Sequence, residues 1–508
     1  MIIHKTGQKT WTNRHQNFTQ AIDDWYDLAD NNSNDILADY NDATLGIQGI
    51  IKEAITAKKR LKAIGGEWSF SKIAASEGIL LNTKPMNISF RIGPNNVASN
   101  YAKSADDLYF AQCGVSVKEL NDRLAARSRS LPTTGASNGQ SIAGAIATGV
   151  HGSAIGFGSI QDAVVGLHLI VSPTRHVWLE KKSYPVVSAS FVANLKAELV
   201  QDDALFNSAL VGLGAFGFVQ GVMLETVPLF LNEAYRYTVK MDADLFKMME
   251  TLDFQNTAIK LPYAKEQPYH FQVLVNPYNK DNEAYITVMY KRPFAQHTMP
   301  ALGKGLAPGD DTAVFLGKLL EMTPGLIPVM MNTLIGASYP LYSKVIGTQG
   351  ETFFNTDLHG KMLSTALGVP LAQVNKVRVL LNDLNAKHGP FPGLFSFRYV
   401  KSTNATLGFT CFEPYTCIIE VDTAATATAM KFYELLWDEL EQQQIAYTFH
   451  WGKLLKADAK KIERLYTING KNRVSQWIQA RNSFIKDAAA MAVFNNEYLE
   501  QLGLATIF

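Results

Sequence analysis

Apolar positions in the first half of the chain alternate between helical and strand-like spacing. Residues 42–60, "DATLGIQGIIKEAITAKKR", carry apolar side chains at helical intervals and end in basic residues, which predicts a helix. The next stretch, "LKAIGGEWSF", begins with strand-like alternation and then reaches two glycines. A helix is predicted over 117–129, ending before Pro132, and "DAVVGLHLIVS" followed by "RHVWLE" predicts a hairpin. The first 230 residues therefore mix helices with strands.

Beyond Pro228 the pattern changes to repeated strand-like alternation. "YHFQVLVNP", "AYITVMYKRP", "LFSFRYVK" and "TCIIEVDT" predict an antiparallel sheet, and a helix follows in "ATAMKFYELLWDELEQQQ". Residues 461–508 have helical spacing. We expect an α+β protein with three parts, namely residues 1–230, 231–455 and a C-terminal helical segment over 456–508.

Length and composition limit the classes of function. A chain of 508 residues is too long for one ordinary core, and 47% hydrophobic with 18% charged residues indicates a globular protein. A formal charge of +1 offers no surface for nucleic acid. We expect no signal peptide, because the opening residues "MIIHKTGQKTWTNRHQ" lack an apolar region, and no membrane span, because no apolar run reaches about 18 residues. The three cysteines indicate a cytoplasmic protein with reduced thiols, although Cys411 and Cys417 are near enough in sequence to pair.

Two glycine-rich stretches carry the candidate chemistry, "GGEWS" and "GQSIAGAIATGVHGSAIGFGS". Glycine lets the main chain approach a ligand closely and turn successive N–H groups toward an anion. Neither stretch has the spacing of the nucleotide-binding P-loop or of the G-x-G-x-x-G dinucleotide motif. Each alone is compatible with an ordinary turn as well as with a diphosphate site.

Together the two stretches resemble one flavoprotein family. "LKAIGGEWSF" resembles the arginine-alanine-isoleucine-glycine-x-glycine-histidine-serine-phenylalanine loop of vanillyl-alcohol-oxidase-type enzymes, nearest the sugar-lactone and alditol oxidases and the class II cholesterol oxidases. Four more segments match in order: "WTNRHQN", "LPTTGASNGQSIAGAIATGVHGS", "DDALFNSALVGLGAFGFVQGVMLETVP" and "YTFHWGK". The resemblance implies a PCMH-type FAD-binding domain, to which the C-terminal segment returns, and a substrate-binding cap domain on an antiparallel sheet.

The resemblance also implies which residues contact FAD, with Ile64 to Phe70 around the diphosphate and Val219 at the adenosine. The full set is Ile64, Gly65, Gly66, Glu67, Trp68, Ser69, Phe70, Gly135, Ala136, Ser141, Gly144, Thr148, Gly149, Val150, His151, Gly152, Ser153, Val219 and Lys453. No metal site is expected.

One departure concerns how the flavin is held. Many relatives bond a histidine to the flavin, and Trp68 stands at that position here. Other relatives add a cysteine farther on, near the place of Thr133 and Thr134. Indole and threonine offer no comparable nucleophile, so we expect noncovalent FAD.

The resemblance places the chemistry on five residues, Arg398, Glu420, Asp422, His450 and Lys453. The motif lysine, Lys453, is implied to stabilise the anionic reduced flavin, and Arg398 to polarise substrate or flavin. Residues i and i+2 of a strand share a face, so Glu420 and Asp422 are predicted to point into one cavity. Glu420 is either the base or the partner of a structural ion pair, and His450 is a second candidate base.

The predicted reaction is oxidation of a CH–OH group of a small or lipophilic alcohol, by hydride transfer to flavin N5 with oxygen as acceptor. The small Gly135 would leave oxygen a path. The alternative is a flavoprotein dehydrogenase, or a tailoring oxidase of natural products, that uses another electron acceptor. The apolar segment Leu316 to Ile335, with Met322, Met330 and Met331, is either a lid for a lipophilic substrate or packed core.

Overall fold

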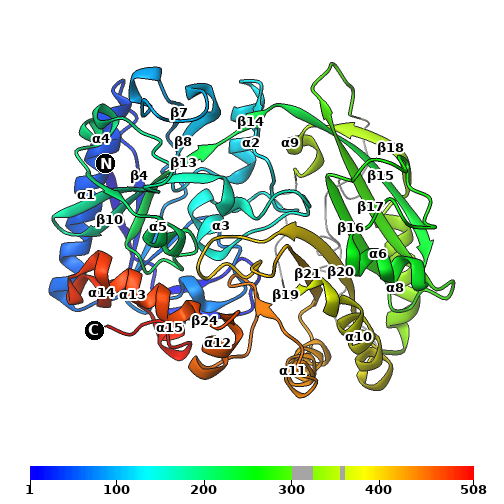
Figure 1. Cartoon of the computed structure of the whole chain (residues 1–508). Coiled ribbons are helices and arrows are strands. Elements are labelled where there is room, and N and C mark those ends of the chain that lie inside the picture. Colours follow the sequence, from blue (N-terminus) through cyan, green and yellow to red (C-terminus); the bar gives the residue numbers. More distant parts are fainter. Residues whose placement is uncertain (300–323, 355–360, 508) are drawn as a thin grey trace.

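Three β-sheets organise the chain in the computed structural model, which describes residues 1–299, 324–354 and 361–507 (Figure 1). The first sheet has four strands in the order β1-β4-β6-β5. Strand β1 pairs antiparallel with β4, whereas β4 and β5 run parallel to β6. The strands are β1 (Ile2–Thr6), β4 (Asp24–Ala29), β5 (Leu61–Ile64) and β6 (Ile79–Asn82).

Helix α1 (Ile36–Ala57) supplies part of the core of this N-terminal region. Its buried side chains include Ala43, Ile47, Ile50, Ile51 and Ala54, at the three- and four-residue spacing of one helix face. The helix begins six residues before the predicted start, because the Asp35 side chain accepts a hydrogen bond from the Ala38 amide and caps it.

A second sheet has six strands in the order β12-β11-β10-β13-β8-β7. They are β7 (Ser89–Arg91), β8 (Leu108–Gln112), β10 (Val164–Ser172), β11 (Arg175–Glu180), β12 (Glu198–Gln201) and β13 (Phe218–Glu225). The predicted hairpin is confirmed as the antiparallel pair β10–β11. The helices of this region are α2 (Val117–Ala125), α3 (Ile142–Thr148), α4 (Ala189–Leu195) and α5 (Asp203–Leu210).

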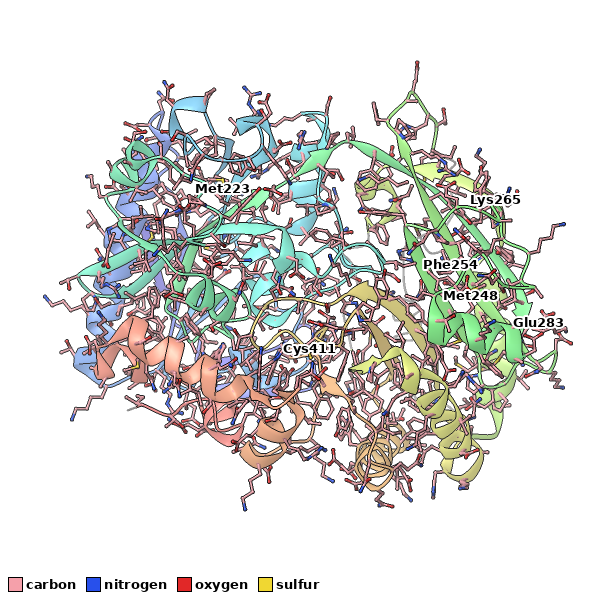
Figure 2. All side chains as sticks on the ribbon, viewed as in Figure 1. Met223, Met248, Phe254, Lys265, Glu283 and Cys411 are labelled. Atoms are coloured by element: carbon pink, nitrogen blue, oxygen red, sulfur yellow. The ribbon has the colours of Figure 1, made fainter. Side chains whose placement is uncertain are left out.

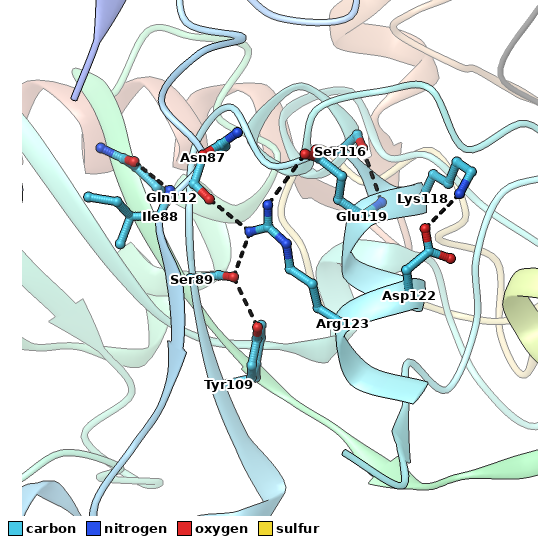
Figure 3. A network of polar contacts seen from close by, with 10 residues as sticks. All are labelled: Asn87, Ile88, Ser89, Tyr109, Gln112, Ser116, Lys118, Glu119, Asp122 and Arg123. Carbon is cyan, nitrogen blue, oxygen red and sulfur yellow. Dashed lines mark hydrogen bonds and ion pairs between the residues drawn. The ribbon is translucent and has the colours of Figure 1, made fainter. Parts of the chain in front are cut away.

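Helix α2 is fixed to the edge of this sheet by a polar network (Figure 3). Arg123 donates to the Asn87 carbonyl and to Ser89 Oγ, and Ser116 and Glu119 form a capping box at the N-terminus. The helix ends at Ala125 rather than at the predicted residue 129, since β9 (Arg129–Ser130) pairs there with β14 (Val227–Pro228).

The third sheet has eight strands, and every pairing in it is antiparallel. The order β18-β15-β17-β16-β20-β21-β19-β22 begins with β18 (Tyr342–Gly347), β15 (Phe230–Lys240), β17 (Glu283–Pro293) and β16 (His270–Val275). It continues with β20 (Gly393–Lys401), β21 (Tyr415–Ala424), β19 (Met362–Pro370) and β22 (Thr448–Phe449). The predicted antiparallel sheet, and with it the α+β class, is confirmed.

Helices α6 (Ala243–Thr251), α8 (Ile327–Ser338), α10 (Val374–His388) and α11 (Ala427–Gln442) belong to this part of the chain (Figure 1). Met248 of α6 and Phe254 beyond it are buried, and the Phe254 ring lies 5.1 Å from that of Phe271 on β16 (Figure 2).

One face of the described part of the apolar segment 316–335 packs as core, whereas Leu326 and Val329 on it are exposed. Met331 and Ile335 of α8 are fully buried in one cluster with Leu274 and Leu394 of the large sheet. Residues 316–323, including Met322, lie outside the described residues.

The C-terminal segment lies beside the N-terminal sheets (Figure 1). Its helices are α12 (Ala459–Leu465), α13 (Arg473–Ile485), α14 (Ala488–Phe494) and α15 (Glu497–Gln501). Helix α13 packs on α5, and α14 packs on α1 and β5. A short hairpin, β23 (Thr467–Ile468) and β24 (Lys471–Asn472), interrupts the predicted helical run. Within the described ranges, no helix is both long and apolar enough to cross a membrane. Cys113, Cys411 and Cys417 are free and buried.

Candidate active site

One large cavity lies where the glycine-rich stretches meet the large sheet and the segment after β22. It encloses about 1640 Å³ between protein atoms, part of it open to solvent. Its lining includes most of the predicted cofactor residues: Ile64, Gly65, Gly66, Glu67, Trp68, Ser69, Phe70, Gly135, Ala136, Ser141, Gly144, Thr148, Val150, His151, Val219 and Lys453. Arg398, Glu420 and His450 line the same cavity. The fold thus brings the predicted cofactor and catalytic sets to one space.

The two glycine stretches touch each other at the cavity wall. A Cβ atom on Gly65 would lie 2.1 Å from Ser141 Oγ, and one on Gly66 would lie 2.3 Å from the Gly139 carbonyl oxygen. A Cβ on Gly139 would in turn lie 2.5 Å from the Trp68 ring. These positions have no room for a side chain, so bare backbone forms this wall, as a diphosphate-binding loop requires.

The opening segment "WTNRHQN" donates hydrogen bonds to main-chain carbonyls of this loop, which accounts for its presence among the matching motifs. Asn13 donates to the Ser69 carbonyl at 3.0 Å, and Asn17 donates to the Phe70 carbonyl at 2.8 Å. His15 donates through Nε2 to the Trp68 carbonyl at 3.2 Å, and its ring stacks on Phe70.

The motif "HWGK" binds the same loop from the other side. The Phe70 amide donates to the Gly452 carbonyl at 2.7 Å, and Ser71 Oγ donates to the Trp451 carbonyl at 2.6 Å. Hydrogen bonds therefore join three motifs that are distant in sequence into one wall of the cavity.

Trp68 and Glu67 both depart from the family loop. Trp68 lines the cavity, and the Arg14 guanidinium lies 4.7 Å from its ring centroid. Glu67 occupies the place of the motif's second glycine and has a φ of 61°, in the left-handed region that glycine adopts most easily. Trp11 donates through Nε1 to Glu67 Oε1 at 3.3 Å, and burial raises the pKa of this carboxyl.

The chemical end of the cavity is built on β20 and β21. Ser396 of β20 pairs with Glu420 of β21, so Arg398, two residues farther along β20, reaches across to Glu420 on the same face. Arg398 Nε lies 3.1 Å from Glu420 Oε2, and both side chains are buried. The ion-pair alternative for Glu420 is thus the observed contact.

Two histidines complete this end of the cavity. His151 Nε2 lies 3.7 Å from Glu420 Oε1. His151 Nδ1 donates to the Gly152 carbonyl at 3.1 Å, so in the neutral ring Nε2 carries no proton and has a free lone pair. Burial and the nearby Arg398 charge lower the pKa of His151 to about 3, so the ring is neutral. His450 Nδ1 accepts the Gly452 amide at 2.9 Å, and burial holds the pKa of His450 well below its usual value. With Nδ1 occupied, neutral His450 presents an N–H and no free lone pair.

Lys453 is held at the cavity by groups behind it. Its Nζ donates to Ser364 Oγ at 2.6 Å and lies 3.8 Å from Asp422 Oδ1, while Ser364 also donates to Asp422. Asp422 itself does not appear in the cavity lining of the described residues. The prediction that Glu420 and Asp422 open into the same cavity is therefore wrong for Asp422, which lies behind Lys453.

Gly149, Gly152 and Ser153 also lie outside that lining and have structural contacts instead. Gly149 ends α3 with a φ of 77°. A Cβ on Gly152 would lie 2.4 Å from the Thr134 carbonyl oxygen, and Ser153 Oγ joins strand β16 to β20.

Sequence reasoning missed several wall residues, among them Trp11, Lys62, Ser137, Gln140, Leu213 and Gly214. All six lie within the segments that carry the resemblance, but the motifs do not show which of their side chains reach the cavity. In the described ranges no group of three or more His, Cys, Asp or Glu side chains could hold a metal.

Residues 44–179 match the family model of the FAD binding domain. An L-gulono-1,4-lactone dehydrogenase of Mycobacterium tuberculosis is 24% identical over 45% of this chain and 43% of its own length. L-gulonolactone oxidase 3 of Arabidopsis thaliana is 29% identical over 32% of this chain and 25% of its own length. The chain thus matches less than half of these relatives.

Cholesterol oxidase from Brevibacterium sterolicum has the same fold, with a TM-score of 0.69 at 13% identity over 98% of this chain and 97% of that one. These findings confirm the resemblance stated above. Residues 44–179 are therefore similar to FAD binding domains, the matched parts of the chain are similar to sugar-lactone oxidases and dehydrogenases, and the fold is that of a cholesterol oxidase.

Proposed function

We propose that this protein binds FAD without a covalent bond and oxidises a CH–OH group of a small or lipophilic alcohol. The observation that carries this proposal is the shared cavity, in which a glycine wall and the cluster of Arg398, Glu420 and Lys453 face one space. Bound FAD would supply the hydride acceptor at N5. The protein has to position the alcohol, accept the hydroxyl proton and stabilise the developing negative charge.

Glu420 is our proposed base. It lines the cavity, whereas Asp422 does not, and His450 has its Nδ1 lone pair already engaged by the Gly452 amide. His151 Nε2 faces Glu420 Oε1 at 3.7 Å with a lone pair. A proton accepted by Glu420 from the substrate hydroxyl would stay on Glu420, beside the neutral ring of His151.

Arg398 and Lys453 are the proposed electrostatic groups. Arg398 is buried and fixes Glu420 Oε2, so the same guanidinium orients the base and stabilises an alkoxide beside it. Lys453 is fixed by Ser364 and projects to the cavity over the Phe70 ring, 5.0 Å from its centroid. A fixed ammonium beside the flavin would stabilise its reduced anion.

The proposal that FAD is bound noncovalently rests on Trp68. An indole at this position can pack against the flavin but cannot form the bond that a histidine forms in relatives. Trp68 is instead fixed between Gly139 and the Arg14 guanidinium, which fits a packing role.

Oxygen is the electron acceptor in this proposal, supported by Gly135. It lines the cavity, and a Cβ there would lie 3.0 Å from Val150 Cγ1 and 3.2 Å from the Ser137 carbonyl. These contacts leave little room for a side chain at Gly135, so the proposal of oxygen rests on the place of this glycine in the cavity lining and on its predicted role beside the flavin. A dehydrogenase that uses another acceptor is the second candidate, favoured by the Mycobacterium tuberculosis relative, which is named a dehydrogenase.

The test is an anaerobic panel of alcohols, from sugar lactones and alditols to sterols, followed by loss of visible flavin absorbance in the FAD complex. Bleaching by at least one alcohol, and fast recolouring in air, is the expected result. Bleaching with slow recolouring would favour the dehydrogenase. A protein that takes up no FAD would refute both.

A further inference from the structure

A buried lysine lies at the cavity wall away from the Arg398–Glu420 cluster. Lys62 is the second residue of β5, is 3% exposed and lines the cavity together with Leu213, Gly214 and Val219. Among the described residues its Nζ donates to two main-chain carbonyls, of Leu213 at 3.4 Å and of Gly214 at 3.3 Å, both long for a charged donor. Burial of an ammonium is unfavourable unless an anion lies near it.

No such anion comes from the described part of the chain. The ion pairs found among those residues leave Lys62 out, and the charged side chains that act on its pKa are the cations Arg481 and Arg60. Arg60 is already paired with Glu500 of α15, and Arg481 of α13 donates to the Leu504 carbonyl at 2.7 Å.

The remaining groups around Lys62 do not supply a charge either. Burial raises the pKa of the Cys113 thiol to about 12, so this cavity residue stays neutral. Helix α14 and strand β6, which pack against β5, carry no titratable side chains, and Lys72 of the short turn after the loop is exposed. Burial, with help from Arg481 and Arg60, lowers the pKa of Lys62 to about 7.

We propose that Lys62 is a phosphate-binding residue of the FAD site, which takes up one proton when the cofactor's diphosphate enters the cavity. The inference rests on the proposed function, because FAD is the anion invoked. The diphosphate of FAD supplies the negative charge that the wall around Lys62 lacks, and Nζ accepts the proton from solvent buffer. The family loop has an always-charged arginine at this position, so the lysine makes cofactor binding sensitive to pH here.

The direction in which pH changes FAD affinity follows from the proton that Lys62 gains on binding. The pKa of Lys62 is lowered in the cofactor-free protein and raised in the complex, so FAD binding is unaffected by pH below about 7. Above that pH the complex holds a proton that the free protein lacks, and FAD affinity falls by up to about tenfold per pH unit.

The experiment is calorimetric titration of the flavin-free protein with FAD, in two buffers of different ionisation enthalpy, at about pH 6 and about pH 8. We expect uptake of close to zero protons at the lower pH and close to one at the higher. ADP-ribose, whose diphosphate is esterified at both ends as in FAD, should show the same uptake, and riboflavin, which lacks phosphate, should show none. Lys62→Arg should bind FAD at both pH values without proton uptake, and Lys62→Met should bind it more weakly at about pH 6.

Three outcomes overturn the proposal. If FAD binds at about pH 8 without proton uptake, the role of Lys62 is refuted and the proposed function is unaffected. The same conclusion follows if Lys62→Arg takes up as many protons as the native protein. No FAD binding under any condition, by a protein whose circular dichroism is native, overturns the proposed function and this inference together.

Discussion

Replacing Glu420 by Gln is the sharpest single test of the proposed chemistry. The amide has nearly the size of the carboxylate, and its oxygen can occupy the place of Oε2, which lies 3.1 Å from Arg398 Nε in the native protein. Its NH2 group would face the His151 Nε2 lone pair, now 3.7 Å from Oε1, so the geometry is retained. What the variant loses is the ability to accept a proton.

The expected magnitude follows from that loss. A positioned general base contributes about 10²- to 10⁴-fold to the rate, so Glu420→Gln should slow anaerobic flavin reduction by at least about a hundredfold. FAD affinity should change by less than about threefold, because the diphosphate wall is untouched. Rapid-mixing absorbance of the FAD complex, with a substrate from the alcohol panel, measures the rate.

Asp422→Asn is the matched control. This carboxylate lies two residues away on the same strand but behind Lys453, so its loss should slow reduction by less than about tenfold. A Glu420→Gln enzyme that reduces its flavin within about tenfold of the native rate would refute Glu420 as base. His450→Gln, tested beside it, would then show whether the base is the histidine.

Three further predictions concern the cofactor and the fold. Asn17→Ala removes one hydrogen bond to the loop, worth about 1 kcal/mol, and should weaken FAD binding by about fivefold in a fluorescence titration; an unchanged dissociation constant would contradict the role of the opening segment. Gly135→Ala places a Cβ 3.0 Å from Val150 Cγ1 and should slow recolouring of reduced enzyme by oxygen more than it slows reduction by substrate, whereas equal effects would argue against an oxygen path there. Acid should destabilise the protein, since burial holds the pKa of four histidines, His151, His168, His270 and His450, below the unfolded value near 6.5. The unfolded chain then binds more protons as the pH falls below about 6.5, and each histidine lowers the free energy of unfolding by about 1.4 kcal/mol per pH unit. A midpoint of urea unfolding that is equal at about pH 7 and about pH 5 would contradict this burial.

Much of the fold could be predicted because periodicity reports local structure directly. The hairpin β10–β11 and the strands β16, β17, β20 and β21 lie where alternation placed them. The predicted ends of α1 and α2 were wrong because a side-chain cap at Asp35 and a distant strand pair at Arg129 set them.

The site could be predicted in part for a related reason. Motifs identify residues but not the direction of each side chain in the folded protein. Arg398, Glu420, His450 and Lys453 line the cavity as the motifs implied, whereas strand alternation alone could not show that Ser364 and Lys453 separate Asp422 from it. Lys62 was missed because its importance comes from burial without an anion, which only the packing of α14 on β5 reveals.

The central claim is that FAD occupies this cavity, noncovalently, with its flavin beside Arg398, Glu420 and Lys453. A crystal structure of the protein with FAD tests it most directly. The account predicts the diphosphate against the backbone of Gly65 to Ser69, Trp68 in contact with the flavin but not bonded to it, and Lys453 Nζ at the ring. A covalent bond to the chain, or FAD bound outside this cavity, would contradict it.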